Sequence, residues 1–292
     1  MSIRSDRVTD SLAYHGEGPV WWAATKQLRF VDMLAGQVIA LNLDGSHARI
    51  DVGADVVACL RPRVAGGAIV ARTRDVAIAD QEDLSDIRPI TEAFIAQRFR
   101  FNEGGCDPDG RFYIGNMAWQ KAVGQAALYC VAPEVVTGEQ EPRKVFGDVT
   151  TSNGLAFSPD GKLAYYNDTE TMRTDVFDYD IEQGLHNRRA FVQFADGEGR
   201  PDGLCVDVEG GVWVAMNKAN AVRRYASDGK LDAIVEFPVR QTTACNFGGP
   251  DLDMLFVTTS REGLDPDDEP AAGSLFVVDP GVKGLPPLPF KG

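Results

Sequence analysis

The chain consists of short apolar-rich runs, each about seven residues long, which Gly, Asp and Pro separate. Phe177, Tyr179 and Ile181 alternate with two aspartates, and this period of two is typical of a half-buried strand. The predicted strands are 27–33, 37–43, 67–73, 111–117, 162–168, 174–181, 211–217, 221–227, 254–260 and 274–280. The best helical candidate is the short segment 91–99, so the pattern predicts an all-β chain.

Two-residue turn signals lie between these runs. They are Asp44-Gly45, Gly66-Gly67, Asp109-Gly110, Asp160-Gly161, Gly210-Gly211 and Asp228-Gly229. Such pairs supply the positive φ angles that tight hairpins need. The chain therefore reads as a succession of antiparallel hairpins.

A longer repeat groups these hairpins. Glycine-led openings recur at Gly18, Gly66, Gly104, Gly154, Gly203 and Gly248. Their spacing of roughly 40 to 50 residues is the length of a four-stranded propeller blade. Six units of about 49 residues account for all 292 residues, so we expect one domain, 1–292, folded as an all-β six-bladed β-propeller with antiparallel blades. A β-sandwich is the alternative, and it does not predict repeats of this length.

Composition narrows the classes of partner. The formal net charge is −14 and there is no basic stripe, which disfavours nucleic acid and anionic membranes. The five cysteines are scattered singly along the chain, and this spacing argues against a disulfide framework and against a structural zinc site. The amino terminus is polar, unlike a signal peptide, and no run approaches the roughly 18 apolar residues of a membrane span. We expect a cytoplasmic protein, monomeric or weakly homo-oligomeric.

Candidate ligands for a cation stand just before four of the opening glycines. They are Glu17, the pair Asn102-Glu103, Asn153 and Asp202. In a propeller the loops that enter the innermost strands converge at one end of the central channel, so these side chains would ring one point. Carboxylate and amide oxygens without His or Cys suit Ca²⁺, Mg²⁺ or Mn²⁺, while Zn²⁺ remains possible. The alternative is that Asn-Gly and Asp-Gly are turn pairs with no ligand role.

Five long motifs resemble one known family. HGEGPVWW, RFRFNEGGCDPDGRFYIGNM, TSNGLAFSPDGKLAYYNDT, RPDGLCVDVEGGVWVA and CNFGGPDLDMLFVTTS are similar to motifs of the SMP-30/gluconolactonase/luciferin-regenerating-enzyme family of regucalcin-like proteins. The resemblance runs from about Gly16 to about Ser260, nearly the whole chain. It implies a six-bladed propeller, in agreement with the repeat.

The resemblance also implies roles for individual residues. Glu17, Asn153 and Asp202 match the family's metal ligands, so one divalent cation is expected in the channel. Arg100 and Asn102 match residues that hold the oxygens of the substrate.

One stretch departs from the family. Many sugar lactonases carry an acidic residue shortly after the G-x-M motif, where this chain has Trp119 and Gln120. We expect these two residues in the wall of the substrate site, and the departure puts the usual aldonolactone specificity in question.

The function expected from this reading is metal-dependent hydrolysis of a lactone, with Asp202 as general base towards water. Arg100 and Asn102 would orient the small-molecule lactone. Two alternatives remain: hydrolysis of organophosphate esters at the same site, and a calcium-binding regulatory propeller without catalysis. Loss of turnover when the metal is chelated would distinguish an enzyme from a calcium-binding propeller without catalysis.

Overall fold

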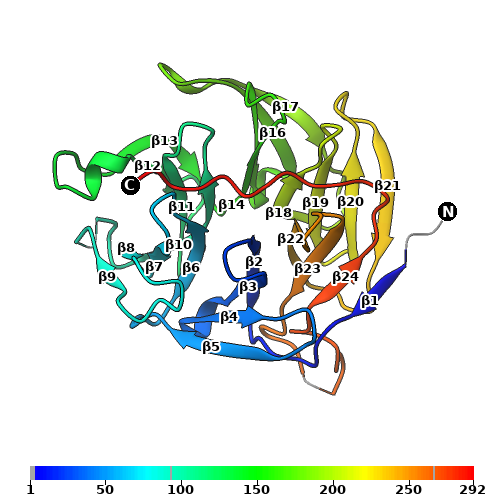
Figure 1. Cartoon of the computed structure of the whole chain (residues 1–292). Helices are drawn as coiled ribbons and strands as arrows, with labels where there is room; N and C mark the ends of the chain where they lie inside the picture. The colour runs from blue at the N-terminus through cyan, green and yellow to red at the C-terminus, as the bar shows by residue number, and fades with distance from the viewer. Residues whose placement is uncertain (1–3, 93, 266) are drawn as a thin grey trace.

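A computed structural model of the chain describes residues 4–92, 94–265 and 267–292. Its strands form six sheets of four strands each, and the strands within every sheet pair antiparallel. The six sheets stand around a common centre (Figure 1). The predicted all-β, six-bladed β-propeller is therefore confirmed.

Each blade runs from an innermost to an outermost strand. The first blade consists of β2 (Gly16–Trp22), β3 (Gln27–Asp32), β4 (Gln37–Leu41) and β5 (His47–Asp51). The second consists of β6 (Val57–Pro62), β7 (Ala68–Arg72), β8 (Val76–Ala79) and β9 (Arg88–Pro89). The third consists of β10 (Phe99–Cys106), β11 (Phe112–Ala118), β12 (Ala126–Val131) and β13 (Arg143–Val149). The fourth and fifth are β14 (Ser152–Phe157), β15 (Leu163–Asp168), β16 (Arg173–Asp180) and β17 (Gly184–Gln193); and β18 (Arg200–Val206), β19 (Val212–Asn217), β20 (Ala221–Tyr225) and β21 (Leu231–Glu236). The described residues also contain the 3₁₀ helices η1 (Met33–Ala35), η2 (Pro133–Val135) and η3 (Thr169–Thr171).

The sixth blade joins the two ends of the chain. It consists of β22 (Thr242–Gly248), β23 (Met254–Thr259), β24 (Phe276–Val278) and, as its outermost strand, β1 (Ser5–Arg7). Ser5 pairs with Val278 and Arg7 with Phe276. Because the first strand completes the last blade, backbone hydrogen bonds close the ring.

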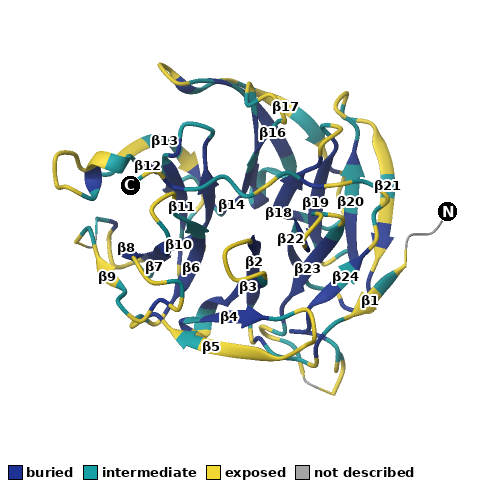
Figure 2. Ribbon diagram, in the orientation of Figure 1, coloured by how far each residue is buried: buried dark blue, intermediate teal, exposed yellow. Residues whose placement is uncertain are grey.

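The core lies between successive sheets. Figure 2 shows buried residues on the strands nearest the centre and exposed residues on the outermost strands. Strands β2 and β10 are buried at every position, whereas β5 is almost wholly exposed. Trp22 of the first blade packs in one cluster with Leu60 and Val70 of the second. Burial of such large side chains between blades holds each innermost strand in place around the axis.

Two of the predicted blade openings are in the wrong register. Gly66 lies in the turn between β6 and β7, and Gly248 is the last residue of β22. The innermost strands of those blades begin at Val57 and Thr242 instead. Gly-Gly pairs serve both as hairpin turns and as strand positions, so the dipeptide alone does not identify a blade opening.

The segment 91–99 forms no helix within its described residues; Phe99 begins β10, and position 93 lies outside the described residues. None of the helices in the described part of the chain is long and apolar enough to cross a membrane.

The C-terminal segment (red in Figure 1) crosses one face of the propeller. Gly284 forms a bridge with Asp207, and Phe290 with Arg63. Residues 285–288 line a cavity of about 90 Å³ together with the ends of several innermost strands. We name this the bottom face, and the face on which the innermost strands begin the top face.

Candidate metal centre

Every innermost strand contains one β-bulge close to its start on the top face. The pairing with the second strand shifts after Glu17, Val57, Phe101, Ser152, Pro201 and Thr242. A bulge bends the strand and redirects its side chains. Because the bulges occupy equivalent places around the axis, they bring Glu17, Ala58, Asn102, Glu103, Asn153, Asp202 and Thr243 to the same level of the propeller.

The glycines that follow Asn153 and Asp202 are needed for close packing between blades. A Cβ atom on Gly154 would lie 2.6 Å from the backbone nitrogen of Leu204, and one on Gly203 would lie 2.5 Å from the Cβ of Ala244. These Asn-Gly and Asp-Gly pairs lie within β14 and β18, so the alternative reading of them as tight turns is wrong.

Three buried carboxylates gather at this level. Glu17, Glu103 and Asp202 are 3%, 5% and 7% exposed. Burial raises the pKa of Glu17 well above its usual range, and the charges of Asp202 and Glu103 raise it further. Burial and then Glu103 raise the pKa of Asp202, whereas Asn217, Arg100 and Asn153 oppose this rise. The carboxylates therefore lie close enough to repel one another.

Glu103 is the least satisfied of these three acidic groups. Burial raises its pKa to about 7, although the charge of Arg61 opposes that shift. Its Oε2 atom is buried without a hydrogen-bond partner among the described residues. Such an arrangement of carboxyl groups calls for a compensating positive charge.

Asn153 is oriented by its neighbours. Its Nδ2 donates to Thr169 Oγ1 at 2.7 Å, and Thr169 Oγ1 in turn donates to the carbonyl oxygen of Pro201 at 2.9 Å. The Oδ1 atom of Asn153 accepts from Asn102 Nδ2 at 3.2 Å. The amide group is thus fixed in one orientation, with its oxygen turned towards Asn102 rather than towards Thr169.

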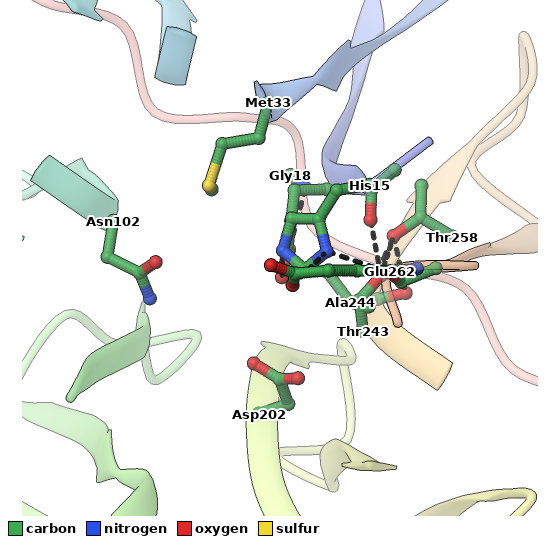
Figure 3. Close-up of polar contacts among 12 residues, drawn as sticks. His15, Gly18, Met33, Asn102, Asp202, Thr243, Ala244, Thr258 and Glu262 are labelled. Atoms are coloured by element: carbon green, nitrogen blue, oxygen red, sulfur yellow. Dashed lines mark hydrogen bonds and ion pairs between the residues drawn. The ribbon is translucent and has the colours of Figure 1, made fainter. Parts of the chain in front are cut away.

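Arg100 is a buried cation beside these groups. Its Nη1 donates to Asn102 Oδ1 at 2.7 Å and to the carbonyl oxygen of Phe101 at 3.0 Å, and lies 3.1 Å from Met33 Sδ. Burial lowers its pKa, although Glu262, Glu17 and Asp202 oppose the shift. Figure 3 shows Met33, Asn102 and Asp202 reaching from different blades towards a common space.

The two wall residues are placed differently. The Trp119 ring lies 5.6 Å from the Arg100 guanidinium carbon, and half of the side chain is exposed. Gln120 is exposed, and none of the contacts of the described residues directs it towards Arg100 or Asp202. The structure thus associates Trp119 with the site more closely than Gln120, and a substrate-binding role for either remains a prediction.

His15 is a member of the site that sequence reasoning missed. Its Nε2 lies 3.9 Å from Glu17 Oε1, and its Nδ1 lies 2.8 Å from Ser260 Oγ and 3.4 Å from Glu262 Oε2. Burial, with a contribution from Arg100, lowers its pKa to about 3. The ring thereby links Glu17 of the first blade to residues that follow β23 of the sixth, and Figure 3 shows it beside Glu262. Only its position two residues before Glu17 could have suggested this role.

The donor set fits a hard divalent cation that uses mixed ligands. Within the three described stretches, no three His, Cys, Asp or Glu side chains form a ligand group on their own. The amide oxygen of Asn153 is the neutral donor that the sequence prediction adds to Glu17 and Asp202. Two mutually repelling carboxylates and an oriented amide are a suitable environment for it, so the predicted set Glu17, Asn153 and Asp202 is compatible with the structure.

Comparison with known proteins gives consistent matches. The sequence profile described as "SMP-30/Gluconolactonase/LRE-like region" matches residues 15–261. The chain is 36% identical over 298 residues to regucalcin from Sus scrofa, covering 100% of this chain and 99% of that protein. A solved luciferin-regenerating enzyme aligns with a TM-score of 0.89 and 26% identity over 100% of both chains. A regucalcin from Agrobacterium tumefaciens, described as a calcium-binding protein, aligns with a TM-score of 0.90 and 27% identity over 100% of this chain and 98% of that one.

Proposed function

The chain belongs to the SMP-30/gluconolactonase/LRE-like family, and from this membership together with the site we propose that it is a metal-dependent hydrolase that opens a lactone. The observation that carries the proposal is the pairing of buried carboxylates with a buried guanidinium at the top of the axis. Glu17 and Asp202 offer negative charge for a cation, while Arg100 offers a positive group for a substrate oxygen.

We assign Glu17, Asn153 and Asp202 as the residues that would hold the cation. The chemistry of these ligands suits Ca²⁺, Mg²⁺ and Mn²⁺, and Zn²⁺ also binds such sites. Such a cation, when bound, polarises a carbonyl oxygen and lowers the pKa of bound water. The Agrobacterium regucalcin is described as calcium-binding, which favours Ca²⁺ as the first metal to test.

Asp202 is the general base of this proposal. The oxygen of a water molecule bonds to the lactone carbonyl carbon, and Asp202 accepts one proton of that water. The bond between the carbonyl carbon and the ring oxygen then breaks, and the proton passes from Asp202 to the ring oxygen, which becomes a hydroxyl group. The other product group is a carboxylic acid, which ionises at neutral pH.

Arg100 and Asn102 orient the substrate. The Arg100 guanidinium is fixed by Asn102 and the Phe101 carbonyl, so it is oriented before substrate arrives. A fixed donor stabilises negative charge that develops on the carbonyl oxygen, because no reorganisation is needed during the reaction.

A substrate screen tests the proposal against its two alternatives. The chelated protein, resupplied with single divalent metals, would be assayed with lactones and with organophosphate triesters. Acid release from lactones that requires metal supports the proposal. Turnover confined to the triesters would replace it with organophosphate hydrolysis, and stoichiometric metal binding without any turnover would indicate a regulatory calcium-binding protein.

A further inference from the structure

The connection between β11 and β12 carries exposed apolar side chains on the top face. In each blade the second strand ends on this face, and in the third blade residues 119–125 follow that end. The exposed fractions of Trp119 and Val123 in this connection are 50% and 76%. Large apolar groups left this exposed on one short segment are candidates for contact with a ligand.

Backbone hydrogen bonds near both ends hold this connection in position. At its start, the backbone nitrogen of Trp119 donates to the carbonyl oxygen of Arg98 at 2.9 Å. Near its end, the backbone nitrogen of Gly124 donates to Thr150 Oγ1 at 3.0 Å. The apolar groups therefore sit on a preformed wall, which lowers the conformational cost of binding against them.

An ion-pair chain ties the middle of the connection to the next two blades. Lys121 Nζ pairs with Glu170 Oε2, and Glu170 Oε1 accepts from Arg200 Nη1 at 2.7 Å. Both oxygens of Glu170 are therefore engaged by cations. Residues 119–125 contain no Asp or Glu, so this part of the wall offers no free carboxylate to the hydroxyl groups of a sugar.

The same wall is apolar where it meets the substrate-orienting residue. The Nη1 atom of Arg100 lies 3.1 Å from Met33 Sδ, and its guanidinium carbon lies 5.6 Å from the centre of the Trp119 ring. A substrate carbonyl held by Arg100 would thus place its neighbouring substituent beside an indole. Packing against an indole is most favourable for apolar or planar groups, because the contact removes their surface from water.

We propose that the lactone opened at this site carries an apolar substituent, an alkyl chain or an aryl ring, that packs against Trp119. This inference rests on the proposed lactone hydrolysis and specifies its substrate class. Trp119 is the specificity-determining residue, and Glu170 is a positioning residue that acts through Lys121.

Two six-membered lactones test this inference. The metal-loaded protein would be assayed with δ-decalactone, which carries a pentyl chain, and with glucono-δ-lactone, which carries hydroxyl groups. Burial of a single methylene is worth roughly fourfold in binding. We expect kcat/KM to favour δ-decalactone by at least about tenfold, and Trp119→Ala to reduce that preference by about tenfold. Trp119→Phe should retain most of the preference, because the phenyl ring restores an apolar face.

Glu170→Ala separates positioning from chemistry. Loss of both ion pairs frees the connection, so KM for δ-decalactone should rise about threefold or more while kcat and metal affinity stay near wild type. Leu43→Ser is the matched control, because Leu43 is 51% exposed in the β4–β5 turn on the bottom face. Leu43→Ser should leave kcat and KM unchanged for both lactones.

The outcomes distinguish this inference from the proposed function. If glucono-δ-lactone is the better substrate, or Trp119→Ala lowers kcat/KM equally for both lactones, the apolar substrate class is overturned while lactone hydrolysis stands. If neither these lactones nor others are hydrolysed with any divalent metal, the proposed function itself is overturned.

Discussion

Asn102 Nδ2 lies 3.2 Å from Asn153 Oδ1, across the boundary between the third and fourth blades. The same nitrogen donates to the carbonyl oxygen of Ser152 at 2.7 Å, and Asn102 Oδ1 accepts from Arg100 at 2.7 Å. A residue assigned to the substrate therefore touches a residue assigned to the metal. Arg100, Asn102 and Asn153 form one hydrogen-bonded row.

The first prediction concerns this link. Asn102→Ala should weaken metal affinity about tenfold as well as impair turnover, because outer partners that orient a ligand typically contribute this much. Isothermal titration with Ca²⁺ and lactone kinetics on the same preparation would measure both effects. Unchanged metal affinity would mean that Asn102 does not support Asn153.

The second prediction contrasts Arg100→Ala with Asn153→Ala. Arg100 is assigned to the substrate, so its loss should cost about 10²- to 10³-fold in rate, and excess metal should not restore it. Asn153→Ala removes a ligand, so its defect should be partly rescued at high metal concentration. The measurement is kcat across a metal titration for both variants. Full rescue of Arg100→Ala by metal, or the absence of any defect in it, would refute the role given to Arg100.

The third prediction separates the two roles of Asp202. Asp202→Asn keeps a side-chain oxygen that can bind a cation. The amide group, however, cannot act as a base at neutral pH. We expect residual metal affinity with activity near background, and an unchanged thermal unfolding profile would verify the fold. A variant that kept most of its activity would exclude Asp202 as the base.

The fourth prediction concerns packing between blades. Gly203→Ala places a Cβ about where Ala244 already lies, 2.5 Å from its Cβ, so the free energy of unfolding should fall by about 1–3 kcal/mol. Gly147→Ala in β13 is the control, because the nearest atoms to its new Cβ are at the flexible end of Lys144, with Nζ at 2.8 Å, and the nearest backbone atom is at an ordinary 3.9 Å. Urea unfolding of both variants is the measurement. Equal stability of the two would show that the fifth and sixth blades adapt without cost.

The sequence predicted the architecture well because the strand period of two and the repeat of 40 to 50 residues both follow from the spacing of apolar residues and turn residues along the chain. It placed Asn153 and Asp202 in register, since each stands at a bulge followed by a glycine. Ala58 and Thr243 occupy the same level without a following glycine, so the dipeptide pattern gave the second and sixth blades the wrong starting point.

Other parts of the site depend on contacts between distant segments. His15 meets Ser260 only because the first and sixth blades are neighbours in the closed ring. Glu170 joins Lys121 and Arg200 across three blades, and no local spacing relates those positions. Such pairs follow from the closed fold and not from any pattern along the chain.

Metal-dependent lactone hydrolysis would be measured by titrating the chelated protein with a single divalent metal and determining bound metal and hydrolysis in the same samples. We predict that the chelated protein is inactive and that activity rises in proportion to bound metal, reaching its maximum at one cation per chain. Hydrolysis that persists at full rate after complete chelation, or one bound cation per chain with no hydrolysis of any lactone, would contradict a metal-dependent lactonase.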